Sequence, residues 1–348
     1  MADFPETIYS PREKENKSGV VYDPTKKTVL YAEDISKLDD EVVAIENSLI
    51  SSVDSFVLSN MSARIGTNLY ALCEDDLYFY CGGGTPYAVK KIRKSDMAIM
   101  AVSANFGGEI RALVCDDTYV YAGGATNFTV KRYLKSDLSY VDQSATYGGA
   151  IYCLAINATH IFAGGATTQK VRKILKSDLS TVADSASFGG SITSIAINDT
   201  HIFASASTFN KIRKILISDM STVQDSGSIT GYAQYMTIDD DYIYYTMSSL
   251  YYVQKMQISN MNVVNTGPVF NMCRGITSDD TYVYVGVSSQ GYIVQLLKSD
   301  LSFVCASPTF PGYIYQIIAN GSDFFVCGTE TDQLRKYSKV RLRYSTPV

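Results

Sequence analysis

Histidine is scarce in this chain of 348 residues, and its placement argues against nucleophilic or metal chemistry. The two histidines, His160 and His201, stand 41 residues apart in the matching phrases HIFAGGA and HIFASAS. In four further copies of this phrase the same position holds tyrosine, at Tyr78, Tyr119, Tyr242 and Tyr282. A position that accepts tyrosine in most copies is a packing position. We therefore expect neither a Ser-His-Asp triad nor a metal site.

Carboxylates recur with the same spacing, but in places that favour turns over catalysis. One set lies between pairs of short strand-like segments: Asp76, Asp117, Asp199, Asp240 and Asp280. Aspartate is common in turns because its side chain hydrogen-bonds to the nearby backbone. A glycosidase needs two carboxyl groups about 5–10 Å apart, and the segments expected to face the interior offer only Glu74 and Glu109. We therefore predict no enzymatic activity and no cofactor.

The residue types favour binding over catalysis. One strand position, flanked by Ile, Leu, Ala and Val, holds mostly long polar or aromatic side chains: Tyr70, Arg111, Tyr152, Thr193, Gln234, Arg274 and Tyr315. We name this set the channel column and expect it to face a water-filled channel. There, Arg111 and Arg274 could hold a carboxylate or phosphate bidentately. The alternative is that these side chains simply line water.

A second group of binding candidates lies in loops whose residues change between copies while the flanking strands stay nearly constant. Loops carry recognition when a rigid scaffold holds them. Their aromatic rings are suited to stacking on sugars or contacting proteins: Tyr87, Phe128, Phe209, Tyr251, Tyr252 and Tyr292. The alternative is that these loops vary because nothing constrains them.

All of these positions belong to one repeated unit of about 41 residues. The phrase VRKILKSDLSTV at 171–182 returns as IRKILISDMSTV at 212–223. Its Ser-Asp pair begins at Ser95, Ser136, Ser177, Ser218 and Ser299, with Ser259-Asn260 in the remaining place. The unit contains four short strand-like segments joined by tight turns, which is the size of a propeller blade. Its second segment occurs seven times, from LYFYCGG to DFFVCGT.

We therefore predict an all-β fold over residues 51–348, a seven-bladed β-propeller with four-stranded blades. The chain resembles the large group of such propellers, although it lacks the Trp-Asp and Gly-His marks of WD repeats and the tryptophan of kelch repeats. A ring of blades must close, because an open blade exposes unpaired strand edges. We expect residues 52–60 to complete the last blade, with the C-terminal segment VRLRYST at 340–346 as the competing candidate.

The third strand of each blade carries a further column, which is cationic in most copies: Lys91, Arg132, Lys173, Lys214, Lys255, Gln295 and Lys336. We expect these side chains to pair with acids of the adjacent blade. Such pairs contribute little to stability when they are exposed.

Residues 1–50 stand outside the repeat. The stretch SGVVYDPTKKTVLYAED predicts a small β-hairpin that precedes the propeller. After it, apolar residues follow at steps of 3, 4, 3 and 4, as in the seam of a coiled coil: Ile35, Leu38, Val42, Ile45 and Leu49. An amphipathic helix lying on its own propeller is one reading. We favour a short parallel coiled coil that makes the protein a homotrimer.

The segment PREKENKSGVVYDPTKKTVLYAEDISKLDDEVVAIE resembles the N-terminal module of tailed-phage virion proteins of the tail-fibre, head-fibre and receptor-binding types. In these proteins a small attachment region and a trimeric helix precede a variable distal domain. The resemblance implies a non-enzymatic virion protein, a fibre or capsid decoration protein, which another virion protein holds through residues 1–30. Its propeller would be displayed distally, to contact a glycan or protein on the host surface. A cellular propeller scaffold and a glycan-active propeller enzyme are the alternatives.

Composition fits these expectations. The net charge of −5 argues against nucleic acid as the main partner. The first residues have no apolar core, so we expect no signal peptide and synthesis in a host cytoplasm. No apolar run approaches the ~18 residues of a membrane span, so we expect no membrane insertion. The seven cysteines form no CxxC pair, and we expect them to be free thiols.

Overall fold

The computed structural model describes residues 21–23, 28–30, 53–288, 291–329 and 332–342. The chain divides into two compact units, one of residues 1–53 with 341–348 and one of residues 54–340. In the first unit, β1 (Val21–Asp23) and β2 (Thr28–Leu30) pair in antiparallel register. The expected coiled-coil helix lies outside the described residues, together with its seam residues Ile35, Leu38, Val42, Ile45 and Leu49.

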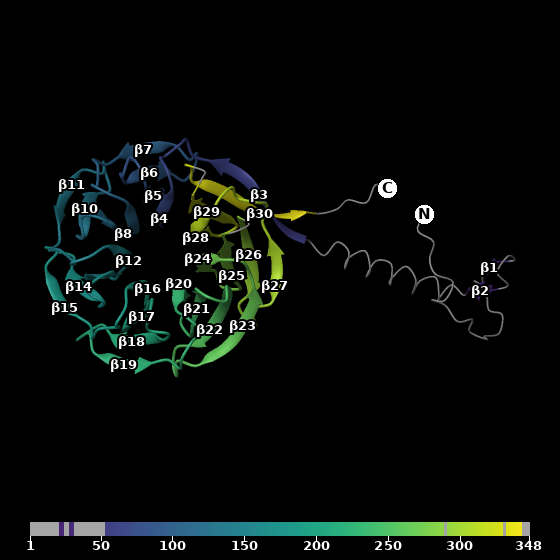
Figure 1. Ribbon diagram of the computed structural model, residues 1–348. Helices are drawn as coiled ribbons and strands as arrows, with labels where there is room; N and C mark the ends of the chain where they lie inside the picture. Colours follow the sequence, from purple (N-terminus) through teal and green to yellow (C-terminus); the bar gives the residue numbers. More distant parts are fainter. Residues whose placement is uncertain (1–20, 24–27, 31–52, 289–290, 330–331, 343–348) are drawn as a thin grey trace. The chain divides into compact units, whose positions relative to one another are not determined.

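The second unit is a seven-bladed propeller, in which seven antiparallel four-stranded sheets surround a centre (Figure 1). Blade 1 comprises β4 (Leu69–Glu74), β5 (Tyr78–Gly83), β6 (Lys90–Arg93) and β7 (Ile99–Val102). Blade 2 comprises β8 (Ile110–Cys115), β9 (Tyr119–Gly124), β10 (Lys131–Leu134) and β11 (Tyr140–Gln143). Blade 3 comprises β12 (Ile151–Ile156), β13 (His160–Gly165), β14 (Arg172–Leu175) and β15 (Thr181–Asp184). Blade 4 comprises β16 (Ile192–Ile197), β17 (His201–Ala206), β18 (Ile212–Leu216) and β19 (Thr222–Asp225).

The remaining blades follow the same order, with the first strand innermost. Blade 5 comprises β20 (Ala233–Ile238), β21 (Tyr242–Met247), β22 (Tyr252–Gln257) and β23 (Val263–Val269). Blade 6 comprises β24 (Cys273–Ser278), β25 (Tyr282–Val287), β26 (Tyr292–Leu297) and β27 (Phe303–Ala306). Blade 7 comprises β28 (Ile314–Asn320), β29 (Asp323–Gly328), β30 (Arg335–Leu342) and, from the other end of the repeat region, β3 (Val53–Met61).

Strand β3 closes the ring, as predicted. Its neighbour in the sheet is β30, and just beyond its end Ser62 donates a backbone hydrogen bond of 2.9 Å to the carbonyl of Leu334. The competing candidate at 340–346 is wrong as far as the structure describes it, because residues 340–342 extend the third strand instead of adding a fourth. Joining the two ends of the repeat region in one blade leaves no open junction in the ring.

Apolar cores lie between neighbouring blades. One of them combines Phe162 and Val171 of blade 3 with Ile195, Ile202 and Ile215 of blade 4. The second strand of every blade is buried at five of its six positions, which means that it is covered on both faces. This double burial explains why the phrase of the second strand varies least along the chain.

The Ser-Asp pair makes the turn between the third and fourth strands. In blade 2 the Asp137 carboxylate accepts a 2.9 Å hydrogen bond from the backbone N–H of Ser139. Between them Leu138 has a φ of +62°, a left-handed conformation that favours glycine, yet its side chain is 1% exposed. A left-handed conformation costs an ordinary residue about 1–2 kcal/mol, and burying a leucine side chain offsets a cost of that size. The same buried Met or Leu with positive φ recurs at Met97, Leu179, Met220, Met261 and Leu301.

The cation of the third strand binds the Ser-Asp turn of the next blade, so the expected pairing with acids of that blade is wrong. The Lys173 ammonium donates hydrogen bonds to the carbonyls of Ile217 at 2.7 Å and Ser218 at 3.2 Å. Four other cations donate to the equivalent carbonyls: Lys91, Arg132, Lys214 and Lys255. Every blade presents backbone carbonyls at this turn, whatever its side chains are. The cations therefore have acceptors without a carboxylate from the adjacent blade. We name this contact the interblade latch.

A second interblade contact starts from the turn between the first and second strands, one residue earlier than predicted. The Asp75 carboxylate accepts backbone hydrogen bonds from Leu77 at 2.9 Å and Tyr78 at 2.8 Å. Its other oxygen accepts from the hydroxyl of Tyr80 at 2.9 Å and pairs with the ammonium of Lys135, from blade 2, at 2.6 Å. The aspartates that we predicted to make this turn lie one residue later in each blade, and all of them are exposed: Asp76, Asp117, Asp199, Asp240 and Asp280.

Removing one latch should weaken the ring measurably. In Lys173→Met the carbonyls of buried Ile217 and exposed Ser218 lose a charged donor, and we expect the free energy of unfolding in urea to fall by about 1–3 kcal/mol. Lys170→Met is the matched control in the same blade, because within the described residues its ammonium makes no hydrogen bond. Equal stability of the two variants, within about 0.5 kcal/mol, would show that the latch does not stabilise the propeller.

The contact of Asp75 predicts a specific acid sensitivity. Burial raises its pKa, but the Lys135 ammonium, two backbone N–H groups and the Tyr80 hydroxyl outweigh burial and hold the pKa at about 2. An exposed aspartate has a pKa of about 3.9, so this stabilisation is complete above that pH and is lost as the pH falls towards 2. Across this window the free energy of unfolding should fall about 1–2 kcal/mol less in Asp75→Asn than in the wild type. The exposed neighbour provides the control, Asp76→Asn, and parallel curves for all three proteins would contradict the prediction.

Candidate functional site

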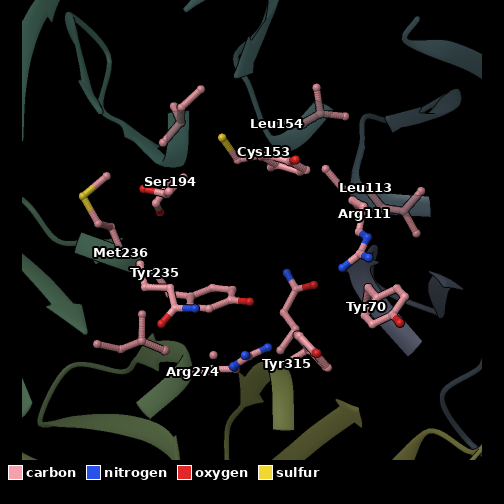
Figure 2. A pocket seen from close by; sticks show the side chains of 18 of the residues that line it. Tyr70, Arg111, Leu113, Cys153, Leu154, Ser194, Tyr235, Met236, Arg274 and Tyr315 are labelled. Carbon is pink, nitrogen blue, oxygen red and sulfur yellow. The ribbon is translucent and has the colours of Figure 1, made fainter. Parts of the chain in front are cut away.

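The inner strands of the propeller enclose a cavity of about 350 Å³, whose lining Figure 2 shows. All seven residues of the channel column line it, one from each blade: Tyr70, Arg111, Tyr152, Thr193, Gln234, Arg274 and Tyr315. The prediction that this column faces the channel is therefore confirmed. The cavity lies near the small end of ligand pockets, which measure about 300–1,000 Å³.

In six of the inner strands the channel-column residue is the extra residue of a β-bulge. In β12, Ile151 pairs with Gly165 and Cys153 pairs with Gly164, which leaves Tyr152 between them without a partner. Such a bulge re-aims the extra side chain and recurs at binding sites. The bulge thus explains how one polar side chain per blade can point into the channel although its neighbours in the strand are apolar.

Blade 6 departs from this pattern at Arg274. In β24 the bulge falls one residue later, so that Arg274 pairs with Gly286 and Gly275 is the extra residue. Gly275 has a φ of +41°, and a Cβ there would lie 3.0 Å from the carbonyl oxygen of Tyr315 and 3.1 Å from the Cα of Gln316. A glycine is required here because blades 6 and 7 approach each other through their backbones.

Arginine and tyrosine side chains form a continuous row along one side of the cavity. The Arg111 guanidinium lies 4.1 Å from the ring centroid of Tyr70, and Tyr70 meets Tyr315 edge to face at 4.9 Å. Arg274 lies 4.6 Å from the ring centroid of Tyr315. These four residues, which we name the Arg–Tyr row, come from the consecutive blades 6, 7, 1 and 2 (Figure 2). Each guanidinium gains from the electron-rich face of its ring.

The two arginines of the row differ in their charge partners. Arg111 forms an ion pair with Glu109, two residues earlier in the chain. Arg274 has no ion pair and no hydrogen bond within the described residues, and the Nε atoms of both arginines are buried without a partner. Arg274 is half-buried, and a partly desolvated guanidinium left without an anion is costly. Arg274 is therefore the group in this cavity that is best prepared to receive an anion.

At the position after the channel column, sequence reasoning missed two large residues that also line the cavity, Tyr235 and Gln316. Burial raises the pKa of Tyr235 to about 12, which keeps its hydroxyl protonated, and Figure 2 shows its ring reaching into the cavity. The Gln316 side-chain oxygen accepts a 2.6 Å hydrogen bond from the backbone N–H of Leu72. The other blades have small residues at this position, Ala71, Ala112, Cys153, Ser194 and Gly275. The size difference was the signal that could have identified both residues.

The loop aromatics do not join the channel residues in one site. Phe128 is 38% exposed, whereas Phe209 packs edge to face on Phe188 at 5.1 Å. Tyr251 and Tyr292 pack against an apolar core of blades 5 and 6. Tyr87 is half-buried at the loop of blade 1. None of the six predicted loop aromatics, Tyr252 included, lines the cavity, so their role in binding stays a separate prediction.

The described lining of the cavity consists of polar, aromatic and apolar side chains and two guanidinium groups. Its described lining contains no aspartate or glutamate. Within the described ranges no three His, Cys, Asp or Glu side chains gather as metal ligands would. No helix among the described residues has the length and apolar character to cross a membrane.

Two solved structures resemble this one at low sequence identity. The WD40 β-propeller domain of Doa1 has a TM-score of 0.72 at 13% identity, covering 84% of this chain and 100% of its own. The computationally designed Ika8 protein has a TM-score of 0.63 at 10% identity, covering 81% of this chain and 99% of its own. No protein-family model and no curated protein sequence matches the chain. At such identities the likeness shows the fold alone.

The close approach at Gly275 predicts a large effect of a small substitution. Gly275→Ala places a Cβ against backbone atoms that cannot move independently, in addition to the cost of positive φ. Gly321→Ala is the matched control, because Gly321 has a φ of +61° but open space around its Cα. We expect Gly321→Ala to lose about 1–2 kcal/mol and Gly275→Ala at least about 1 kcal/mol more. Equal losses in urea unfolding would mean that blades 6 and 7 are not closely packed here.

Proposed function

We propose that this chain is a non-enzymatic recognition protein whose propeller binds a surface carbohydrate at its central channel. The observation that carries the proposal is the cavity lining, in which an unpaired guanidinium stands among tyrosines and polar side chains. Aromatic faces pack on the C–H faces of sugars, while hydroxyl, amide and guanidinium groups bind their oxygens. The described lining has no pair of carboxylates to serve as acid and nucleophile, which weighs against the glycan-active alternative.

We further propose that the protein is a tailed-phage virion component, a fibre or capsid decoration protein that displays the propeller to its host. Support for this part is the resemblance of the N-terminal segment alone. In this proposal residues 1–30 attach the chain to another virion protein. The seam from Ile35 to Leu49 joins three chains in a homotrimer.

Trimerisation and carbohydrate binding can be tested together. We expect the full chain to have the native mass of a trimer and the chain beginning at Ser51, which retains all strands of the propeller, that of a monomer. On immobilised bacterial surface polysaccharides the trimer should bind about 10²–10⁴-fold more tightly than the monomer, because linked sites bind with avidity.

Three results would contradict the proposal. A monomeric full chain would remove the coiled-coil argument and the homotrimer that it predicts. Release of new reducing ends from a bound polysaccharide would show an enzyme, and a full chain that binds no polysaccharide in a broad panel would exclude carbohydrate recognition.

A further inference from the structure

The charge balance of the cavity narrows the class of ligand that it can hold. Two guanidinium groups line it, but Glu109 already neutralises Arg111. One positive charge, on Arg274, therefore remains without a counter-charge within the described lining. A single fixed charge matches a monoanion, whereas a phosphate dianion would bring a second negative charge into a small and partly desolvated space.

The geometry at Arg274 favours a planar anion. Its guanidinium is stacked on the ring of Tyr315, which covers one face of the group and leaves its N–H edge available. That edge matches the two oxygens of a carboxylate in a bidentate arrangement. The Nε itself is buried from solvent, as it also is in Arg111, so we expect the carboxylate to meet the two terminal N–H groups of Arg274.

The rest of the lining is suited to a neutral polyhydroxylated body attached to that carboxylate. Tyr235 reaches into the cavity with a protonated hydroxyl (Figure 2). The preceding residue, Gln234, also lines the cavity, and its amide can donate and accept hydrogen bonds. Thr193, in blade 4, donates to the carbonyl of Ala233 at 2.8 Å, so its oxygen can still accept a hydrogen bond. Alternating donors and acceptors beside tyrosine rings fit the hydroxyl groups and C–H faces of a sugar.

We infer that the channel binds one acidic monosaccharide unit, with its carboxylate on Arg274 and its ring against the tyrosines of the Arg–Tyr row. This inference rests on the proposed carbohydrate recognition and names the chemical class of the ligand. The volume of about 350 Å³ suits a single sugar unit, either free or at the end of a chain.

Titration calorimetry of the full chain tests the inference directly. The probes are glucuronate, galacturonate and N-acetylneuraminate, with glucose and galactose as neutral counterparts and with acetate and inorganic phosphate as simple anions. At least one acidic sugar should bind tenfold or more tightly than its neutral counterpart, than acetate and than phosphate. In Arg274→Gln that preference should disappear, and Arg274→Lys, which keeps the charge but not the bidentate edge, should be intermediate.

Arg213→Gln is the matched control for loss of a stacked arginine. Arg213 lies over the rings of Phe188 and Phe209, outside the cavity, and pairs with Asp225. This variant should bind the acidic sugar with the affinity of the wild type. Circular dichroism of each variant checks that the propeller is folded before its binding is compared.

Several results would overturn the inference. They are binding of none of the acidic sugars, equal binding of acidic and neutral sugars, tighter binding of phosphate or acetate, and an Arg274→Gln variant with unchanged affinity. If polysaccharides bind but no acidic monosaccharide does, this inference fails while the proposed function stands. If an acidic monosaccharide binds but no polysaccharide does, the site is correctly assigned and surface recognition is wrong.

Discussion

The propeller depends on one recurring contact, the hydrogen bonds from a third-strand cation to the carbonyls of the next blade's Ser-Asp turn. From Lys173 to Ile217 and from Lys91 to Lys135 the contact spans 44 residues in each case. The Lys255 ammonium reaches the carbonyl of Lys298 over 43 residues, so the contact tolerates a change of one residue between donor and acceptor. A larger change would carry the turn away from the cation, and this requirement keeps the repeat length nearly constant. The buried leucine or methionine with positive φ serves the same contact, because it shapes the Ser-Asp turn so that its carbonyls face the cation.

The repeat is least regular in blades 6 and 7, whose inner strands supply Arg274 and Tyr315 to the cavity. In blade 6 the latch cation is replaced by Gln295, which is fully buried and accepts a 3.3 Å hydrogen bond from the thiol of Cys305. In blade 7 Lys336 pairs with Asp323 of its own blade at 2.7 Å. The shifted bulge at Gly275 falls between the same two blades. Departures from a local rule that gather in one place are typical of a functional site, since the rest of the ring shows that the rule is compatible with the fold.

Much of the fold could be predicted because burial leaves a strong pattern in the sequence. A second strand covered on both faces must be apolar, and a channel column must interrupt an apolar strand with polar residues. What could not be predicted depends on backbone atoms, which look alike in every residue. The acceptors of Lys173 are carbonyls, so the sequence contained no sign of them. The choice between Asp75 and Asp76 depended on a one-residue register of the turn, and the placement of Arg274 depended on which residue of β24 is bulged.

Arg111 and Arg274 show how far a column of equivalent positions can be interpreted. In the sequence they are the same residue in the same strand of two blades, and both were candidates for an anion. Their neighbours two positions earlier differ, since Glu109 supplies a carboxylate to Arg111 and Met272 supplies none to Arg274. One arginine is thus neutralised within its own blade, and the other keeps its charge for the channel. The repeat provides equivalent places around the ring, and the chemistry of each place is decided by the few residues beside it.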